Sequence, residues 1–306
     1  MKALVTGGAG FIGSNVVALL LEKKWEVRAL DDFSSGCLDN LNGLDAALME
    51  GDIRDAETCV KACEGVDAVF HLAASVGRQR SLDYPRLDSE INLVGTVNIL
   101  EGMREHGVKK IVYSSSAAIF GEPETETVPE DHPQDADSPY GVSKLAAEKM
   151  ILSYRRLYGI QAVCLRYFNI YGIRQRYDPY GNVIPIFARR LLEKQPITIY
   201  GDGRQTRDFL NVRDVARANY LAAMSSQNGV YNLGSGSAVT IAQLARDMRD
   251  ISGVSVETEY APRRPADVLH CGANSEKAAR ELGFRASVPL GEGLVDYWQW
   301  LRAQER

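Results

Sequence analysis

Apolar residues in the first half of the chain alternate between short β-rich runs and longer amphipathic stretches. Helical patterns fill most of the gaps between the runs. Because each right-handed crossover returns the chain to the same sheet, this alternation predicts a doubly wound parallel sheet with helices on both faces. Ligands of such folds bind beyond the carboxyl ends of the strands. The runs expected to form strands are Ala3–Thr6, Val27–Leu30, Ala47–Gly51, Ala68–Leu72, Lys110–Ser114 and Gln161–Arg166.

The second half of the chain has a less regular pattern. After Arg166 it enters loops rich in Tyr, Pro and Gly, and the acidic segment 122–139 before it holds too few apolar residues to be buried. We therefore expect an α/β fold of two interleaved lobes, a larger one of residues 1–167 plus about 209–235 and a smaller one of residues 168–208 and 236–306. The further elements expected are a strand at Ile197–Tyr200 and helices at Ile186–Lys194, Val212–Met224, Ile241–Ser252 and Leu290–Gln304.

Composition and charge exclude several classes of protein. The 306 residues include 35 Lys and Arg against 40 Asp and Glu, a net charge of −5, which offers no basic footprint for nucleic acid or an anionic membrane. No apolar run approaches the roughly 18 residues of a transmembrane helix, so neither a signal peptide nor a membrane anchor is expected. Of the five cysteines only Cys59 and Cys63 are close, which favours buried thiols in a reducing cytoplasm over a metal site.

A glycine-rich segment follows the first predicted strand. Gly7, Gly10 and Gly13 have GxxGxxG spacing, and Phe11 and Ile12 lead into an apolar helix. Gly7 permits a tight turn, Gly10 lets backbone N–H groups approach a pyrophosphate, and Gly13 allows close packing of helix on strand. The helix N-terminus adds partial positive charge, so this segment predicts a dinucleotide site.

An acidic pair follows the second predicted strand. Asp31, with Asp32 beside it, comes eighteen residues after Gly13, where a carboxylate meets the adenosine ribose hydroxyls of a dinucleotide. A carboxylate at this position repels a 2′-phosphate, so the pair predicts NAD rather than NADP. Arg28 lies within the preceding strand and is expected to point away from the site.

Three polar residues suggest proton-transfer chemistry. Tyr140 and Lys144 are four residues apart, which places both side chains on one face of a helix. A neighbouring ammonium and a positively charged nicotinamide favour phenolate, so Tyr140 could act as a base near neutral pH. A serine run ending at Ser116 follows the strand that begins at Lys110, so a hydroxyl emerges at the carboxyl edge of the sheet.

The glycine loop, Asp31, the strand-end serine and Tyr-x-x-x-Lys occur in an order that resembles the extended short-chain dehydrogenase/reductase family. Its members have a Rossmann-type fold and mostly act on nucleotide sugars, and the resemblance covers essentially the whole chain. It implies that Tyr140 is the acid/base, that Lys144 holds the nicotinamide ribose, and that Ser116 hydrogen-bonds the reacting sugar hydroxyl. Ser114 and Ser115 are expected to serve the backbone or the cofactor.

The residues after Ser116 separate the reactions of this family. Sugar dehydratases carry Asp or Glu there as a second acid/base, whereas this chain has Ala117 and Ala118. The resemblance therefore implies inversion at C4 of a UDP-hexose through a 4-keto sugar, with NAD regenerated. A nucleotide-sugar dehydratase or reductase and a catalytically silent NAD-binding sensor remain alternatives.

The expected NAD contacts lie after successive strands. Asp52 and Ile53 are expected to frame the adenine, although Asp52 could be a plain loop residue, and Asn92 matches a family residue near the cofactor but could equally be a satisfied polar group in the core. The complete set is Gly7, Gly10, Phe11, Ile12, Gly13, Asp31, Asp32, Ser34, Ser35, Gly36, Asp52, Ile53, Leu72, Ala73, Ala74, Asn92, Ser114, Tyr140, Lys144 and Tyr167.

The substrate contacts are expected mainly in the second lobe. By resemblance, Asn169 contacts the substrate diphosphate, Arg207 contacts phosphate, and Arg264 with Asp267 clamps the diphosphate and the uridine ribose. Arginine suits phosphate because its planar fork can donate two hydrogen bonds. The complete set is Arg78, Ser116, Tyr140, Phe168, Asn169, Arg176, Asn182, Val183, Ile184, Thr198, Tyr200, Arg207, Arg264, Asp267 and Cys271.

Departures from the family pattern leave the identity of the sugar undetermined. Phe120 stands where Tyr is usual and Ala118 where Thr is frequent, while the small Cys271 suggests a larger sugar pocket. Arg176 and Arg78 could pair with a C6 carboxylate or could face solvent. Glucose, N-acetylglucosamine and glucuronate therefore all remain candidates.

Two helices carry apolar faces that bear on assembly. In this family, segments like Glu90–His106 and Ser143–Tyr158 pair across a two-fold axis, so a homodimer is expected. The alternative is that each apolar face only covers its own sheet.

Overall fold

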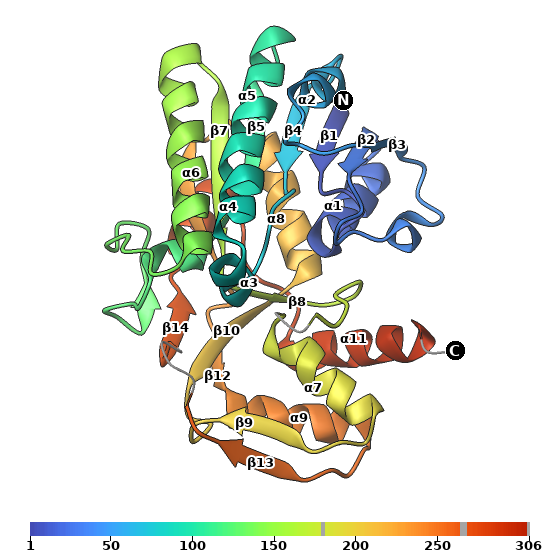
Figure 1. Cartoon of the computed structure of the whole chain (residues 1–306), viewed down its shortest axis with the longest axis vertical. Helices are drawn as coiled ribbons and strands as arrows, with labels where there is room; N and C mark the ends of the chain where they lie inside the picture. The colour runs from blue at the N-terminus through green and yellow to red at the C-terminus, as the bar shows by residue number, and fades with distance from the viewer. Residues whose placement is uncertain (179–180, 264–267, 305–306) are drawn as a thin grey trace.

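The computed structural model describes residues 1–178, 181–263 and 268–304. Its larger lobe is built around a parallel sheet in which the described residues form seven strands in the order β3-β2-β1-β4-β5-β7-β11 (Figure 1). The strand order reverses between β1 and β4, so a crevice is expected at their carboxyl ends. The strands are β1 (Lys2–Thr6), β2 (Glu26–Asp31), β3 (Ala47–Glu50), β4 (Ala68–His71), β5 (Lys110–Ser116), β7 (Gln161–Tyr167) and β11 (Gly229–Leu233).

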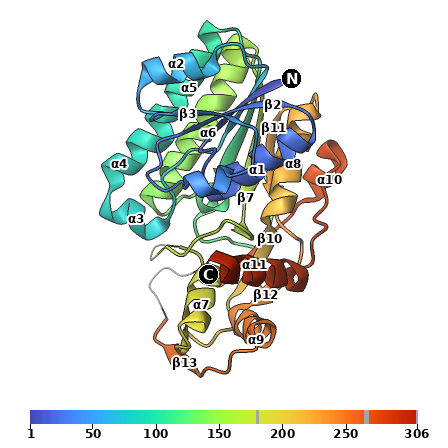
Figure 2. The same cartoon turned by 90° about the vertical axis from the view of Figure 1, so that its right-hand side faces the viewer.

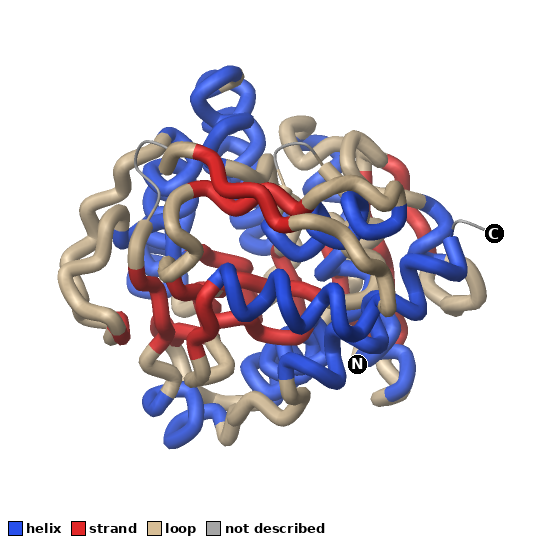
Figure 3. Tube along the Cα trace, turned by 90° about the horizontal axis from the view of Figure 1, so that it is seen from below, coloured by secondary structure: helices blue, strands red, loops and turns tan. Residues whose placement is uncertain are grey.

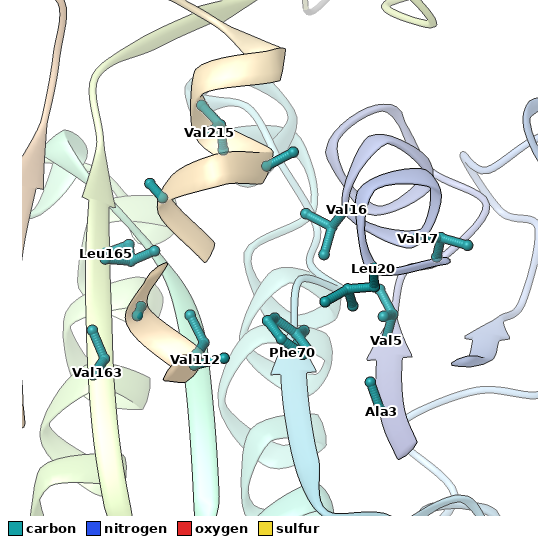
Figure 4. Packing of buried hydrophobic residues seen from close by; sticks show 14 of the residues in the cluster. Ala3, Val5, Val16, Val17, Leu20, Phe70, Val112, Val163, Leu165 and Val215 are labelled. Carbon is teal, nitrogen blue, oxygen red and sulfur yellow. The ribbon is translucent and has the colours of Figure 1, made fainter. Parts of the chain in front are cut away.

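Helices cover both faces of this sheet because successive side chains along each strand point to opposite sides. Ala3 and Val5 face the layer of α1 and α8, while Leu4 between them faces α2, α5 and α6. Figure 4 shows Val16 and Leu20 of α1 directed toward the strands. The helices are α1 (Phe11–Glu22) and α8 (Val212–Met224) on one face, and α2 (Ala56–Cys63), α5 (Gly95–Glu105) and α6 (Pro139–Tyr158) on the other.

The smaller lobe lies at the carboxyl edge of the large sheet (Figures 1 and 2). Its main sheet has the order β12-β10-β14-β6, β8 pairs with the far half of β10, and β9 pairs with β13. Figure 3, viewed from this end, shows helices packed beside short strands. The elements are β6 (Thr127–Val128), β8 (Asn169–Tyr171), α7 (Val183–Leu192), β9 (Ile197–Tyr200), β10 (Thr206–Asn211), β12 (Ala238–Thr240), α9 (Ile241–Ser252), β13 (Thr258–Ala261), β14 (His270–Ala273) and α11 (Leu290–Gln304).

The predicted fold class is confirmed, and the six predicted strands of the large sheet agree with the structure to within one or two residues. The expected lobe limit near residue 209 falls inside β10, which pairs within the smaller lobe. The acidic segment is not wholly superficial, because β6 pairs with β14 and Val128 is fully buried. Helix α10 (Glu276–Leu282) packs back on β11 and α8.

Three predicted helices begin at other residues in the structure, and one of them, α7, begins at Val183 rather than Ile186. α6 begins at Pro139 rather than Ser143, because Ser138 Oγ accepts a hydrogen bond from Gly141 N at 3.2 Å and proline suits the first helical position. The predicted helix Glu90–His106 is the C-terminal part of a longer run of consecutive helical segments. Its parts are α3 (Arg78–Asp83), α4 (Pro85–Ser89), a π-helical turn η2 (Glu90–Val94) and α5.

One ion pair is fully buried behind the carboxyl end of β5. Arg166 donates to Glu148 through Nη2 at 2.7 Å and Nε at 3.0 Å, and Ser115 Oγ donates to the same carboxylate at 2.7 Å. Both charged side chains are at most 1% exposed. Such a pair becomes costly when one partner is lost, because the other charge stays buried and unpaired.

We expect Glu148→Ala to lower the stability of the protein by about 3–5 kcal/mol, measured as a shift in the denaturation midpoint. The control is Arg86→Ala, which breaks the exposed Arg86–Glu90 pair and should cost at most about 1 kcal/mol. Equal losses in the two variants would contradict a structural role for the buried pair.

Candidate active site

The glycine loop between β1 and α1 is a close-packed backbone cradle. Gly7 has φ of +67°, and a Cβ there would lie 2.8 Å from Ala73 N. A Cβ at Gly13 would overlap the carbonyl oxygen of Gly7. At Gly10 a Cβ would meet one atom of the described residues, that same carbonyl oxygen, and would otherwise point into open space. The protein's own packing leaves this side of the loop bare, which fits a pyrophosphate seated on the N-terminus of α1.

Asp31 ties the end of β2 to this loop. Its Oδ2 accepts a hydrogen bond from Ala9 N at 2.8 Å, and its Oδ1 accepts one from Phe33 N at 2.9 Å. Burial raises the pKa of the carboxyl, while these backbone donors oppose the change. Arg28 donates to carbonyl oxygens at the end of α2, away from the loop, as expected.

Asp52 lines a cavity of about 490 Å³ between β3 and η2, together with Arg54, Asp55, Glu90 and Val94. Arg54 Nε donates to Asp52 Oδ2 at 2.8 Å and holds the pKa of that carboxyl below its usual range. The neighbouring Ile53 is 5% exposed and packs in the core beneath α5. A contact of Ile53 with the adenine would therefore involve its backbone rather than its buried side chain.

Asn92 uses its amide within the protein. Its Oδ1 accepts from Ser75 N at 2.8 Å, and its Nδ2 donates to Ser75 O, Asp88 Oδ2 and Ser143 Oγ at 3.0 to 3.2 Å. The side chain is 2% exposed. These contacts favour the structural interpretation of Asn92 over the predicted cofactor contact.

The other predicted cofactor residues follow the carboxyl ends of the parallel strands, at the same edge as the glycine loop. Leu72 N and Ala73 N donate to Thr6 Oγ1 at 3.2 Å, and Ser34 donates to Asp32 Oδ1. By position, Phe11 and Ile12 begin α1, Asp32, Ser34, Ser35 and Gly36 follow β2, and Leu72, Ala73 and Ala74 follow β4.

Ser116, Tyr140 and Lys144 are brought together at this edge. Ser116 is the last residue of β5, and the other two lie in the first two turns of α6. The Ser116 hydroxyl lies beside the Tyr140 phenol and favours its phenolate form. Ser116 Oγ accepts a hydrogen bond from Ala118 N at 3.2 Å. Residue 117 begins the 3₁₀ turn η3 (Ala117–Phe120), which presents small or apolar side chains after the serine.

Burial sets the charges of this group. It raises the pKa of Tyr140 to about 12, although the neighbouring Ser116 hydroxyl works in the opposite direction. It lowers the pKa of Lys144 to about 7. The Lys144 ammonium lies 4.5 Å from the ring centroid of Tyr113. Tyr140 therefore keeps its proton at neutral pH in the protein alone, and the phenolate needs further positive charge nearby, which a bound NAD⁺ carries.

The side chains of Ser114, Ser115 and Tyr167 make contacts with other buried residues of the protein. Ser115 binds Glu148, as described above. The Tyr167 phenol accepts a hydrogen bond from Asn219 Nδ2 at 2.7 Å and also interacts with Ser114. Tyr167 is 5% exposed, which favours a packing role over the predicted cofactor contact. The choice of Ser116 within the serine run agrees with this geometry.

Several predicted substrate residues lie on neighbouring strands of the smaller lobe. Asn169 pairs with Phe209, and Arg207 pairs with Cys271. The Phe168 ring centroid lies 6.4 Å from that of the buried Phe120. Two more of these residues, Thr198 and Tyr200, are half-buried on β9, and Val183 begins α7 after its N-cap Asn182.

Three predicted substrate residues have other partners. Arg176 lies 3.5 Å from Asp39 in the loop after β2, and Arg78 donates to Asp137 at 2.8 Å. Ile184 is 1% exposed in the core of the smaller lobe, so a substrate contact at this position would come from its backbone. Arg264 and Asp267 lie outside the described residues.

Sequence reasoning missed the groups that surround Lys144 and those that join the lobes. His71 stacks on Tyr113 at 5.7 Å, and Asp88 is fully buried beside α6. Across the lobes, Arg80 binds Asp178 at 2.5 Å, and Arg174 Nη1 donates to Ser14 O at 2.8 Å. No local pattern marks these residues, because their partners are distant in the sequence.

The described part of the chain contains no helix long and apolar enough to cross a membrane. Within the same residues, no cluster of three or more His, Cys, Asp or Glu side chains is arranged to hold a metal ion.

Comparison with known proteins agrees with this geometry. Residues 3–234 match the model of the NAD dependent epimerase/dehydratase family. The chain is 38% identical to a UDP-glucose 4-epimerase of Halalkalibacterium halodurans over 98% of its length and 95% of that protein. A UDP-glucose 4-epimerase structure from Thermotoga maritima, with UDP-glucose, superimposes with a TM-score of 0.95 at 38% identity over the full length of both chains. One from Thermus thermophilus, in complex with NAD, gives 0.92 at 38% identity over 99% of each. The chain therefore belongs to the NAD dependent epimerase/dehydratase family.

Proposed function

We propose that this protein is an NAD-dependent epimerase that inverts C4 of a UDP-hexose through a 4-keto sugar. The observation that carries the proposal is that Ser116 and Tyr140 lie side by side near Lys144, next to a glycine cradle and with no carboxylate in η3. The 4-epimerase activity of similar full-length proteins supports it.

We assign NAD to the larger lobe. Gly7, Gly10 and Gly13 would hold the pyrophosphate, Asp31 the adenosine ribose, and Lys144 the nicotinamide ribose. In the described part of the chain the Lys144 ammonium makes no hydrogen bond or ion pair, so its donors remain available for ribose hydroxyls. When bound, NAD⁺ accepts a hydride from C4 of the sugar and later returns it.

Tyr140 moves the proton in this proposal. Its phenolate oxygen takes the proton of the C4 hydroxyl as the C4–H bond breaks, and it gives the proton back when the ketone is reduced. Ser116 donates a hydrogen bond to the C4 oxygen and orients it toward Tyr140. Inversion requires that the ketone present its opposite face before reduction, so the sugar must turn while the UDP part stays bound.

The contacts around Ser116 favour epimerisation over dehydration. Elimination of water from a 4-keto sugar calls for a second acid and base near C5 and C6. The side chains that follow Ser116 are Ala117, Ala118 and the buried Ile119, none of which can transfer a proton.

We assign the nucleotide sugar to the smaller lobe, with Asn169 and Arg207 on the diphosphate. The strands that carry them, β8 and β10, are paired, so both side chains are held by one rigid element. Arg78 and Arg176, which could have read a C6 carboxylate, already face Asp137 and Asp39. These ion pairs favour a sugar without a carboxylate, glucose or N-acetylglucosamine, over glucuronate.

We infer a cytoplasmic location and a homodimer. All five cysteines are free thiols, as in a reducing compartment. Exposed apolar residues occur along α4, η2 and α6, where Leu87, Val94, Leu157 and Tyr158 are between 39% and 68% exposed. Exposed apolar side chains on neighbouring helices suit a two-fold helix-to-helix interface.

Incubation with UDP-glucose, UDP-N-acetylglucosamine and UDP-glucuronate, without added cofactor, should give the C4 epimer of at least one neutral sugar, detected by NMR. NAD carried by the purified protein should suffice, because the hydride returns to the sugar in each turnover. A persistent 4-keto or dehydrated product would instead indicate a dehydratase, and no conversion of any sugar would favour a sensor.

Tyr140→Phe should lower kcat by about 10²- to 10⁴-fold, because the proton of the C4 hydroxyl loses its acceptor. NAD content, measured by absorbance after denaturation, should stay near that of the parent. Tyr260→Phe is the matched control, since Tyr260 is 61% exposed on β13, and it should keep the parental rate. An unchanged kcat in the Tyr140 variant would remove the base from the mechanism.

Light scattering coupled to gel filtration should report twice the mass of the chain for the parent protein. Leu157→Asp should give monomers, because it buries a charge in the expected interface. Met224→Asp, at the end of α8 on the opposite face, is 54% exposed in the parent and should leave the dimer intact. A monomeric parent would show that the apolar faces do not form this interface.

A further inference from the structure

A buried carboxylate lies beside the first turn of α6. Asp88, on α4, is fully buried, and its Oδ2 accepts hydrogen bonds from Ser143 Oγ at 2.5 Å and Asn92 Nδ2 at 3.2 Å. Its Oδ1 is buried and has no hydrogen-bond partner in the described part of the chain. An unpartnered buried carboxylate oxygen is costly, so its presence calls for an explanation.

The position of Ser143 connects this carboxylate to the proposed catalytic group. Ser143 immediately precedes Lys144 and lies one turn after Tyr140, and α4 and α6 run side by side (Figure 1). The bond between Asp88 and Ser143 joins residues 55 positions apart in the sequence. It therefore holds the turn that carries both catalytic side chains against a separate helix.

Burial raises the pKa of Asp88, while hydrogen bonds from Ser143 and Asn92 and the charge of Lys144 oppose this change. The other groups that face Lys144 leave Asp88 as its uncompensated anion. Glu148 is neutralised by Arg166, and burial raises the pKa of Cys164, Tyr113 and Tyr140, so that all three keep their protons. Burial also lowers the pKa of His71 to about 3, so this imidazole is neutral. The titratable groups that interact with Lys144 or lie against it are Asp88 on α4, Glu148 and Tyr140 on α6, Cys164 on β7, Tyr113 on β5 and His71 on β4.

We propose that Asp88 is a positioning residue that keeps Lys144 in its ammonium form and anchors the first turn of α6 through Ser143. This inference rests on the proposed function, because it concerns the lysine that acts with Tyr140. Asp88 touches neither the substrate nor the cofactor in this scheme and acts through its two neighbours on α6.

Burial and the charge of Asp88 shift the pKa of Lys144 in opposite directions. Burial pulls the pKa of Lys144 down to about 7, and attraction to Asp88 pushes it up. Loss of the Asp88 charge therefore leaves burial unopposed, and Lys144 releases its proton at a lower pH. A neutral lysine no longer favours the phenolate of Tyr140, so the loss of activity grows as the pH rises. Asp88 also raises the pKa of Tyr140, so removal of its charge favours the phenolate directly, but by a factor that does not change with pH below that pKa.

Two variants separate charge from geometry. Asp88→Asn keeps the size and an oxygen that can accept from Ser143 but removes the charge. Ser143→Ala keeps the charge and removes the hydrogen bond. Asp88→Ser, smaller and also neutral, repeats the charge test should the amide of the first variant not pack.

The direct measurement is the titration of Lys144 by NMR in protein that contains ¹³C-labelled lysine, with the Lys144 signal assigned by its absence in Lys144→Met. In Asp88→Asn the titration midpoint should fall by about one pH unit or more. In Ser143→Ala it should stay near the parental value. An unchanged midpoint in Asp88→Asn would overturn the proposal, whether or not the protein proves to be an epimerase.

The kinetic measurement is the ratio of kcat in each variant to kcat in the parent, followed from pH 6 to pH 9 with UDP-sugar. For Asp88→Asn this ratio should fall as the pH rises through the parental Lys144 midpoint, by about tenfold for each unit of midpoint shift. For Ser143→Ala the ratio should be lower than one but independent of pH. A pH-independent ratio in Asp88→Asn would assign Asp88 to packing alone, and an inactive parent would refute the proposed function while the NMR test still decides the role of Asp88.

Discussion

The close approach of α6 to the end of β5 is the constraint on which the site depends. A Cβ at Gly141 would overlap the carbonyl oxygen of Ala118, so glycine is required where the helix meets η3. Ser138 caps the helix at the same point, and Pro139 sets its first turn. As a result the hydroxyls of Ser116 and Tyr140, 24 residues apart, lie beside each other. Every chemical step assigned to the protein requires these two hydroxyls to meet at one sugar oxygen.

Burial gives this arrangement its electrostatic character. The same exclusion of water that raises the pKa of Tyr140 lowers that of Lys144, so the isolated protein is biased toward a neutral pair. A positive cofactor would act against that bias at Tyr140, and the nearby carboxylate of Asp88 acts against it at Lys144. The protein alone therefore holds the reacting groups in place but leaves their charged forms unfavourable until the cofactor is bound.

A strand pair and several side-chain bonds connect the two lobes. β6 comes from a loop of the larger lobe and pairs within the smaller one. Across the crevice, Arg80 binds Asp178 and Arg174 binds the carbonyl of Ser14 at the start of α1. The segment after β8 is thereby fastened to both sides of the crevice, which is consistent with a cofactor that stays bound through many turnovers.

Much of the fold and part of the candidate site could be predicted from the sequence. The period of the apolar residues predicted the parallel sheet, and the glycine spacing predicted the turn at which a Cβ at Gly13 is impossible. The strand-end position of Ser116 and the one-turn spacing of Tyr140 and Lys144 were also evident. The apolar segment predicted from Ser143 begins four residues after the start of α6 at Pro139, because the first turn of this helix carries few apolar side chains, although Ser138 and Pro139 are recognisable helix-start signals.

The sequence by itself determined the backbone, since strand period, glycine positions and helix spacing are local properties of the chain. Only the tertiary structure decided which polar groups are partners. Asp88 meets Ser143, Arg176 meets Asp39, and Ile184 turns into the core. The physical reason is that a hydrogen bond or ion pair depends on distance in space, and the partners here lie up to 137 positions apart along the chain, with no local pattern to link them.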